Sequence, residues 1–322
     1  MDSKTRVLTA LARQKPDRPP FNFWMDRRLM AGYEQRHGHR HWRVTACGAD
    51  VIETFHGLGF PSGPTVARDG TEWHTGPLFD DWAQADELPM PDPHDENVYG
   101  LMQADLREFP DTAVFLDVGT AWGIIAGMRT YERIYMDMLD HPDELRRLAR
   151  RINDALKVVV DRACRIGVTA IYLMEDLATT RSLSFSPEMI REFCLDDAAE
   201  LVAIAHSHNR PVLFHSDGCV RDLVPMLADM GVAAVNPLQP HLNDLSAFKR
   251  DFGHRLAVYG GLDNCYTIPD GTADDVRQHV RDVFETLGRP DGGLIFSTHD
   301  IPLGTSDENV QAMIETIRRC RY

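Results

Sequence analysis

From about residue 110 onward, short β-branched or aromatic runs alternate with longer stretches of helical periodicity. The runs that we expect to form strands are 113–117, 169–174, 212–215, 233–236, 256–259 and 294–297. Such alternation is typical of parallel strands joined by crossover helices. Two earlier runs, 21–25 and 50–55, bring the expected strands to eight. Eight such strands close naturally into a (β/α)8 TIM barrel, so we predict one α/β barrel domain over residues 1–322.

The helices between these runs carry recognisable start signals. Pro142 stands where a first helical turn should begin, and 143–166 follows with apolar spacing near 3.6. Ser186-Pro187 starts a further helix by the same logic. The segment 272–275 is a near capping box, with Asp in the place of Glu, and a helix should follow it.

Residues 56–110 are less regular than the rest of the chain. Within them, 66–68 and 72–74 flank Asp69-Gly70, which is a strong hairpin signal. We interpret 56–110 as an insertion that covers the barrel mouth and not as a separate domain.

The charge composition of the chain argues against two classes of binding partner. The chain has 34 Lys and Arg against 49 Asp and Glu, a formal net charge of −15. This balance argues against nucleic acid and anionic membrane surfaces, and no apolar run approaches the length of a membrane span. The first residues open an amphipathic helical segment and lack a signal peptide's apolar stretch, and the six cysteines form no Cys-x-x-Cys pair. We therefore expect a cytoplasmic protein with reduced thiols.

The most informative motif is His215-Ser-Asp217, which follows the apolar run 211–214. Strand side chains alternate, so His215 and Asp217 can face one point, and His299 after the last expected strand can reach the same point. Two histidines and one carboxylate suit a divalent metal with open positions, either catalytic zinc or non-haem iron. The alternative is a hydrogen-bonded loop histidine followed by an ordinary Asp-Gly turn.

Nearly every expected strand ends in a residue that can bind a metal or transfer a proton. Because barrel enzymes place their chemistry at the carboxyl ends of the strands, these residues should converge on one mouth. They are Asp26, Glu53, Asp117, Glu175 with Asp176, His215 with Asp217, Asn236 with Gln239, Asp263, and His299 with Asp300.

Two members of this ring are candidate catalytic residues. Glu175 is either a fourth ligand or general base, or the partner of Arg181 in an ion pair. Asp117 accepts a hydrogen bond from substrate, or it caps the turn that follows its strand.

Asn236 and Gln239 bind substrate, or they satisfy the backbone of their own loop. The candidate substrate-binding residues are Asn236, Gln239, Asp263 and Trp24.

The chain resembles the uroporphyrinogen decarboxylase superfamily, which includes zinc-dependent methyltransferases of corrinoid and coenzyme M metabolism. The resemblance spans nearly the whole chain, and its best segments are 175–187, 211–218, 231–240, 259–263 and 305–310. It implies the same barrel fold that the strand pattern predicts.

The resemblance also implies a ligand set, from which this chain departs. The methyltransferase branch carries His-x-Cys and a later Cys; His215 matches that histidine, Asp217 the first cysteine and His299 the second. Replacing both thiolates makes the site harder and a stronger Lewis acid, which should favour oxygen substrates, bound water or a metal other than zinc. The decarboxylase branch uses no metal and holds carboxylates with N-terminal arginines, whose motif the segment around Arg27 and Arg28 matches poorly.

These inferences predict a metal-dependent methyltransferase or demethylase that acts on a small methylated substrate. Zinc is the metal expected first and iron is the alternative. A corrinoid protein that docks over the barrel mouth is the expected methyl partner, and a homodimer is the oligomer we consider. The alternatives are a metal-dependent lyase or decarboxylase of the same superfamily and, third, a non-catalytic binding protein.

Overall fold

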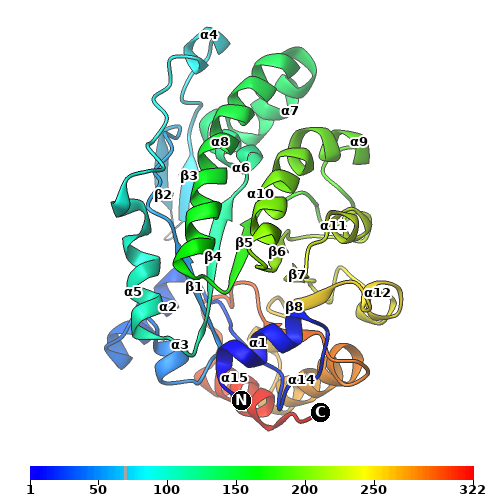
Figure 1. Ribbon diagram of the computed structural model, residues 1–322. Helices are drawn as coiled ribbons and strands as arrows, with labels where there is room; N and C mark the ends of the chain where they lie inside the picture. Colours follow the sequence, from blue (N-terminus) through cyan, green and yellow to red (C-terminus); the bar gives the residue numbers. More distant parts are fainter. Residues whose placement is uncertain (69–70) are drawn as a thin grey trace.

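The computed structural model, which describes residues 1–68 and 71–322, is built around one curled parallel sheet (Figure 1). Its strands pair in the order β1-β4-β5-β6-β7-β8-β9. Their bounds are Val51–Phe55 (β1), Ala113–Gly119 (β4), Ala170–Met174 (β5), Val212–His215 (β6), Ala234–Asn236 (β7), Ala257–Gly261 (β8) and Leu294–Ser297 (β9). The predicted α/β barrel class is confirmed, and each of these strands lies within two residues of its predicted bounds.

The eighth predicted strand, 21–25, is not a regular strand. The segment makes isolated parallel bridges to the β9 side, Phe21 with Phe296 and Met25 with Ile301. On the β1 side the Asp50 amide donates to the Phe21 carbonyl at 2.8 Å, so the segment lies between the two edge strands. The prediction of a full strand was wrong because side chains bind some of the backbone groups that a continuous ladder would need.

Two contacts illustrate this capture. The Arg43 guanidinium donates to the Phe23 carbonyl at 2.5 Å, and the Trp24 amide contacts the Thr298 hydroxyl at 3.1 Å. At Phe23 and Trp24 the backbone therefore has a side-chain partner, whereas the amides of Asn22 and Asp26 donate to the Phe296 and Ile301 carbonyls, both at 2.9 Å.

Helices surround the sheet. Their bounds are Ser3–Leu11 (α1), Arg27–His37 (α2), Trp42–Thr45 (α3), Trp82–Ala85 (α4), Gly100–Glu108 (α5), Ala121–Arg129 (α6), Tyr131–Asp140 (α7), Pro142–Ile166 (α8), Pro187–Ile190 (α9), Asp196–Ser207 (α10), Val224–Met230 (α11), Leu245–Phe252 (α12), Thr267–Asp270 (α13), Ala273–Val283 (α14) and Asp307–Arg319 (α15). The predicted start signals are confirmed: Pro142 begins α8, Ser186 caps α9, and Thr272 with Asp275 forms a capping box for α14.

Helix α1 closes the amino end of the barrel. Its apolar side chains belong to a buried cluster with residues at or next to the starts of the strands: Val7, Ala10 and Leu11 with Val51, Ala113, Ala170, Leu213, Ala234 and Ala257. Beside this apolar cluster, Arg6 and Arg18 pair with the buried Asp50, so the amino end is closed and the open end of the barrel lies at the carboxyl ends of the strands.

Residues 56–110 connect β1 to β4. They include the antiparallel pair β2 (Thr65–Arg68) and β3 (Thr71–His74), as the hairpin signal predicted, while the predicted turn at 69–70 lies outside the described residues. Helix α5 contacts both β1 and β4, so it serves as the crossover helix of this β/α unit.

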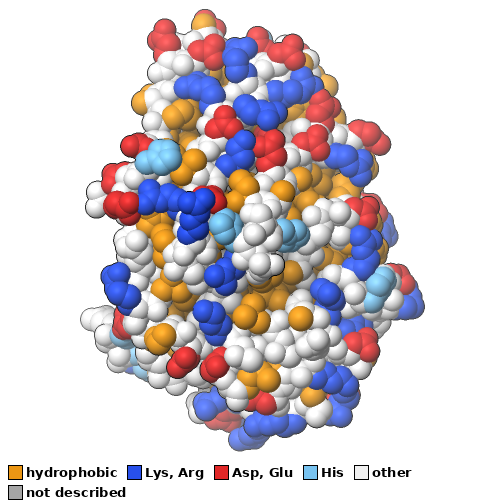
Figure 2. All heavy atoms as spheres, viewed as in Figure 1, with side chains coloured by type: hydrophobic (Ala, Val, Ile, Leu, Met, Phe, Trp, Pro, Cys, Tyr) orange, Lys and Arg blue, Asp and Glu red, His pale blue; other side chains and the backbone are white. Residues whose placement is uncertain are grey.

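Two features expected from the composition can be compared with the structure: the distribution of surface charge and the apolarity of the helices. Acidic and basic side chains are interspersed across the face shown in Figure 2. In the part of the chain that the structure describes, no helix has the length and apolarity needed to cross a membrane.

Candidate metal centre and mouth cavity

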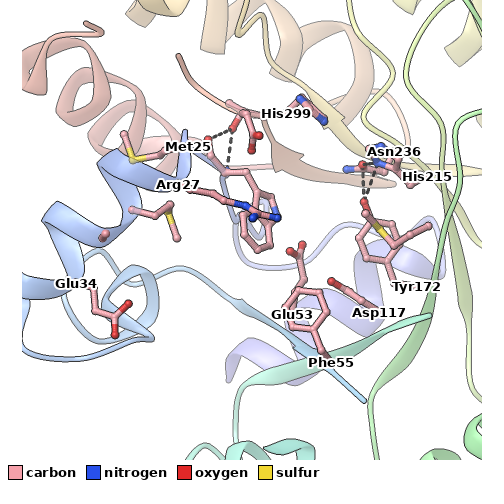
Figure 3. A pocket seen from close by; sticks show the side chains of 16 residues that line it. Met25, Arg27, Glu34, Glu53, Phe55, Asp117, Tyr172, His215, Asn236 and His299 are labelled. Carbon is pink, nitrogen blue, oxygen red and sulfur yellow. Dashed lines mark hydrogen bonds between the residues drawn. The ribbon is translucent and has the colours of Figure 1, made fainter. Parts of the chain in front are cut away.

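A cavity of about 430 Å³ opens at the carboxyl ends of the strands (Figure 3). Its size is within the range typical of small-molecule sites. Side chains from β1, β4, β5, β6 and β7 form its floor, residues 298–300 after β9 form one wall, and α2 forms another. The residues predicted for the mouth that line it are Trp24, Glu53, Asp117, His215, Asn236, His299 and Asp300.

The three predicted metal ligands lie together at this mouth. Ligand atoms of His215, Asp217 and His299 all lie within 4.8 Å of one another. His299 Nε2 is 3.2 Å from Asp217 Oδ2. His215 is buried, whereas the side chains of Asp217 and His299 are 32% and 33% exposed, which leaves an open side for a substrate.

A hydrogen bond at Nδ1, opposite the nitrogen that faces the cluster, fixes the ring orientation of His215. Its Nδ1 lies 2.6 Å from the Asn236 side-chain oxygen, so the Nδ1–H donates to that amide. The Tyr172 hydroxyl donates to the same oxygen at 2.5 Å, and the Asn236 nitrogen donates to the Tyr259 carbonyl at 2.5 Å. This arrangement leaves Nε2 as the free acceptor, which is the tautomer that a metal ligand needs.

The environment of the Asp217 carboxylate shows whether a cation would fit this cluster. Its Oδ1 is buried and has no hydrogen-bond partner within the described residues. Burial raises the pKa of Asp217, and the neighbouring His299 and His215 act in the opposite direction. An unpartnered buried carboxylate oxygen beside two imidazoles is costly unless a cation binds it, so the residues present fit a divalent metal.

The loop after β5 brings a further carboxylate to this cluster. Asp176 Oδ1 accepts from the Asp217 amide at 2.9 Å and lies 3.7 Å from His215 Nε2. Glu175 lies elsewhere: it accepts from the Gly123 amide at 2.9 Å, from the Asp176 amide at 3.0 Å and from the Thr120 hydroxyl.

Glu175 therefore anchors the start of α6 and does not line the cavity. Among the described residues it makes no hydrogen bond or ion pair with Arg181. Burial raises its pKa to about 7, against the opposing effect of those hydrogen bonds. Its predicted role as ligand or base remains a prediction.

Asp117 lies beside Glu53 on the inner face of β4 and β1 (Figure 3). Tyr259 donates its hydroxyl to Glu53, and the Asn22 amide donates to the same oxygen at 3.2 Å. Burial raises the pKa of Glu53. Burial and then the charge of Glu53 raise the pKa of Asp117 well above its usual range.

Two predicted substrate-binding residues lie outside the cavity lining. Gln239 accepts from the Gly218 amide at 2.8 Å and so holds the loop that carries Asp217. Asp263 accepts from the amides of Cys265, Tyr266 and Thr267. It also forms a second group of potential metal ligands with His241 and Cys265. Those hydrogen bonds and one from the Thr267 hydroxyl already use its lone pairs.

Several lining residues were not among the predicted site residues. Tyr172 could have been found, because strand alternation places it on the same face as Met174, which also lines the cavity. Arg27, Met30 and Glu34 come from α2, and nothing in the local sequence shows that this helix borders the mouth.

Fold and cavity together define an α/β-barrel protein with its polar groups at the carboxyl ends of the strands, as in barrel enzymes. The family model described as uroporphyrinogen decarboxylase (URO-D) matches residues 69–320. The chain therefore belongs to the uroporphyrinogen decarboxylase family, and the superfamily placement made from sequence is confirmed.

Relatives named uroporphyrinogen decarboxylase are similar in sequence. One from Methylococcus capsulatus is 24% identical over 73% of this chain and 68% of its own length. One from Thioalkalivibrio sulfidiphilus is 27% identical over 76% of this chain and 72% of its own length.

Among solved structures, a methyltransferase from Methanosarcina mazei has a TM-score of 0.74 at 14% identity, covering 99% of this chain and 98% of that one. A B12-independent methionine synthase from a Shewanella species has a TM-score of 0.53 at 11% identity, covering 95% and 93%. At such low sequence identities, the similarity is evidence of a shared fold alone.

Proposed function

We propose that this protein is a metal-dependent methyltransferase or demethylase whose substrate presents a methylated oxygen at the barrel mouth. The observation that carries the proposal is the convergence of His215, Asp217 and His299 on one point, with a buried Asp217 oxygen left unpartnered. This donor set contains no thiolate, and imidazole and carboxylate ligands favour a harder metal site that suits oxygen.

Each residue of the cluster has a definable task. A divalent ion held by His215, Asp217 and His299, with zinc expected first and iron second, would supply Lewis acidity to the substrate oxygen. Asn236 keeps His215 in the tautomer that leaves Nε2 free. The exposed faces of Asp217 and His299 leave room for the substrate and for a methyl acceptor such as a corrinoid protein above the mouth.

The walls of the cavity suit a small, partly apolar substrate. Its apolar lining residues are Trp24, Met25, Met30, Ala31, Phe55 and Met174. The Arg43 guanidinium lies 4.3 Å from the centre of the Trp24 ring and fixes that wall. An aromatic or short aliphatic methyl ether would fit these surfaces.

The second candidate function is decarboxylation, which the names of the sequence relatives and the presence of Arg27 in the lining favour. A polycarboxylate such as uroporphyrinogen matches this cavity poorly, however. The acidic lining residues are Glu34, Glu53, Asp117 and Asp300, against the single arginine in the lining, Arg27. Like charges repel a substrate that carries many carboxylates.

The test is methyl transfer by zinc-loaded protein from a panel of methyl ethers to cob(I)alamin or a thiol, followed by absorbance and mass spectrometry. We expect transfer from at least one oxygen-linked donor, and loss of it in His215→Ala. If metal-loaded protein transfers methyl to no acceptor, and metal-free protein instead releases carbon dioxide from uroporphyrinogen, the decarboxylase function is correct.

A further inference from the structure

The floor of the cavity contains a carboxyl pair that metal binding does not use. Glu53 extends from β1 and Asp117 from β4, and both side chains line the cavity. The strands are in register with Glu53 opposite Phe115 and Phe55 opposite Asp117, so the two carboxyls lie diagonally on the same inner face. Figure 3 shows them next to each other and directed into the pocket.

In the described part of the chain, this pair lacks a direct countercharge. Within the described residues neither Glu53 nor Asp117 takes part in an ion pair, and Arg43, the cation acting on both, donates to the Phe23 carbonyl. Glu53 Oε2 and Asp117 Oδ1 are both buried and lack a hydrogen-bond partner. Two buried carboxyls at one place cannot both ionise easily, so such a pair retains a proton.

The surroundings of the two carboxyls favour the proton on Asp117. Glu53 accepts hydrogen bonds from Tyr259 and Asn22, which favour its charged form. Asp117 accepts no hydrogen bond from the described residues, so no donor stabilises its charge. Within the described residues no hydrogen bond or ion pair holds the Asp117 carboxyl group, so it can turn toward a substrate in the cavity.

We propose that Glu53 and Asp117 share one proton and that Asp117 delivers it to the substrate oxygen released when the methyl group leaves. The proposal deepens the proposed function and rests on it. In this step the C–O bond breaks and its electron pair stays on oxygen. The methyl carbon forms a new bond with the electron pair of a cob(I)alamin or thiolate acceptor. The proton moves from Asp117 to the oxygen, and the released product is a neutral alcohol or phenol.

The groups that face the pair set the direction of its pH dependence. They are Arg43 from α3, Tyr172 from β5 and Tyr259 from β8, with His215 of β6 behind Tyr172. Arg43 favours ionisation of both carboxyls, and the hydrogen bonds from Tyr259 and Asn22 favour that of Glu53. Burial, the largest cause for each carboxyl, and the charge of Glu53 acting on Asp117 oppose it. Activity should therefore persist at neutral pH and decrease in alkali as the shared proton is lost.

The first test is infrared spectroscopy of metal-free protein, at a pH above the value of about 7 to which burial raises the pKa of Glu175. We expect a buried protonated-carboxyl band in the wild type that disappears in Asp117→Asn and remains in Glu53→Gln, because burial is the larger cause of the raised pKa of Asp117. The control is Asp197→Asn, because Asp197 is a half-buried carboxyl on α10 whose pKa is also raised by burial. A wild type without the band, or a band that survives in Asp117→Asn, overturns the proposal.

The second test compares two methyl donors with zinc-loaded protein and cob(I)alamin: 2-methoxyphenol, whose leaving oxygen is basic, and 4-nitroanisole, whose leaving oxygen needs no proton. Asp117→Asn should lose roughly 100-fold or more in kcat with the first donor and less than about 10-fold with the second. Equal losses with both donors overturn the role of proton donor. If the wild type turns over neither donor, the proposed ether demethylation fails and the donor role fails with it, while the infrared result still decides whether the pair holds a proton.

Discussion

Replacing Asn236 by alanine should weaken metal binding without removing a ligand. The Asn236 oxygen accepts from His215 Nδ1 at 2.6 Å and from the Tyr172 hydroxyl at 2.5 Å, and its nitrogen donates to the Tyr259 carbonyl at 2.5 Å. Loss of a group that orients a metal-bound histidine typically costs ~10–100-fold in affinity. This corresponds to roughly 1.4–2.8 kcal/mol of binding free energy.

The same change should also destabilise the metal-free protein. Three buried groups lose their partner, and each stranded group costs about 1–3 kcal/mol, so we expect a loss of roughly 3–9 kcal/mol in the free energy of unfolding. Asn309→Ala is the matched control. Asn309 is likewise buried and donates to the Ile268 and Gly271 carbonyls at 2.9 and 2.8 Å, but it does not line the cavity.

The assay is zinc competition with a chromophoric chelator, paired with urea unfolding of the metal-free proteins. Asn309→Ala should lower stability and leave the zinc Kd unchanged, whereas Asn236→Ala should change both. Asn236→Asp keeps the acceptor for His215 and should retain most of the zinc affinity. An unchanged zinc Kd in Asn236→Ala would refute the reasoning that this amide orients His215.

Three further predictions concern stability and the thiols. Because burial raises the pKa of Glu175 from 4.5 to about 7, its contribution to stability is full below about 4.5 and is lost as the pH rises through about 7. Urea unfolding across this range should show a decrease on the order of 3 kcal/mol that is absent in Glu175→Gln. Gly218→Ala places a Cβ 2.5 Å from the Thr179 carbonyl at a φ of +94°, so it should shift the loop of Asp217 and lower both melting temperature and zinc affinity. Cys219 lines a groove between α11 and α12, and Cys219→Ser should leave zinc content unchanged when measured by mass spectrometry.

The sequence predicted those parts of the fold that local periodicity encodes. The buried runs near 113 and 294 became β4 and β9, because short β-branched segments between helices can bury both faces only in a parallel sheet. The segment 21–25 is likewise rich in large apolar residues, yet part of its backbone is bound by side chains such as Arg43, and no local pattern reveals a partner that is distant in sequence.

The candidate site likewise has one part that the sequence predicted and one part that it could not predict. His215, Asp217 and His299 were predicted as one cluster, because strand ends converge in a barrel and all three follow clear strand signals. The division of work between Glu175 and Asp176 could not be predicted. The two are adjacent in sequence, and the position of α6 decides that Glu175 turns toward Thr120 and Gly123 while Asp176 reaches Asp217.

The central claim is a metal site without sulfur at the barrel mouth, and X-ray absorption spectroscopy of zinc-loaded protein tests it most directly. We expect one zinc ion per chain, lost in His215→Ala and in His299→Ala. Its inner shell should contain only nitrogen and oxygen at about 2.0–2.2 Å, with the outer scattering of imidazole. A sulfur shell at about 2.3 Å, or zinc bound at full content in both histidine variants, would contradict the account.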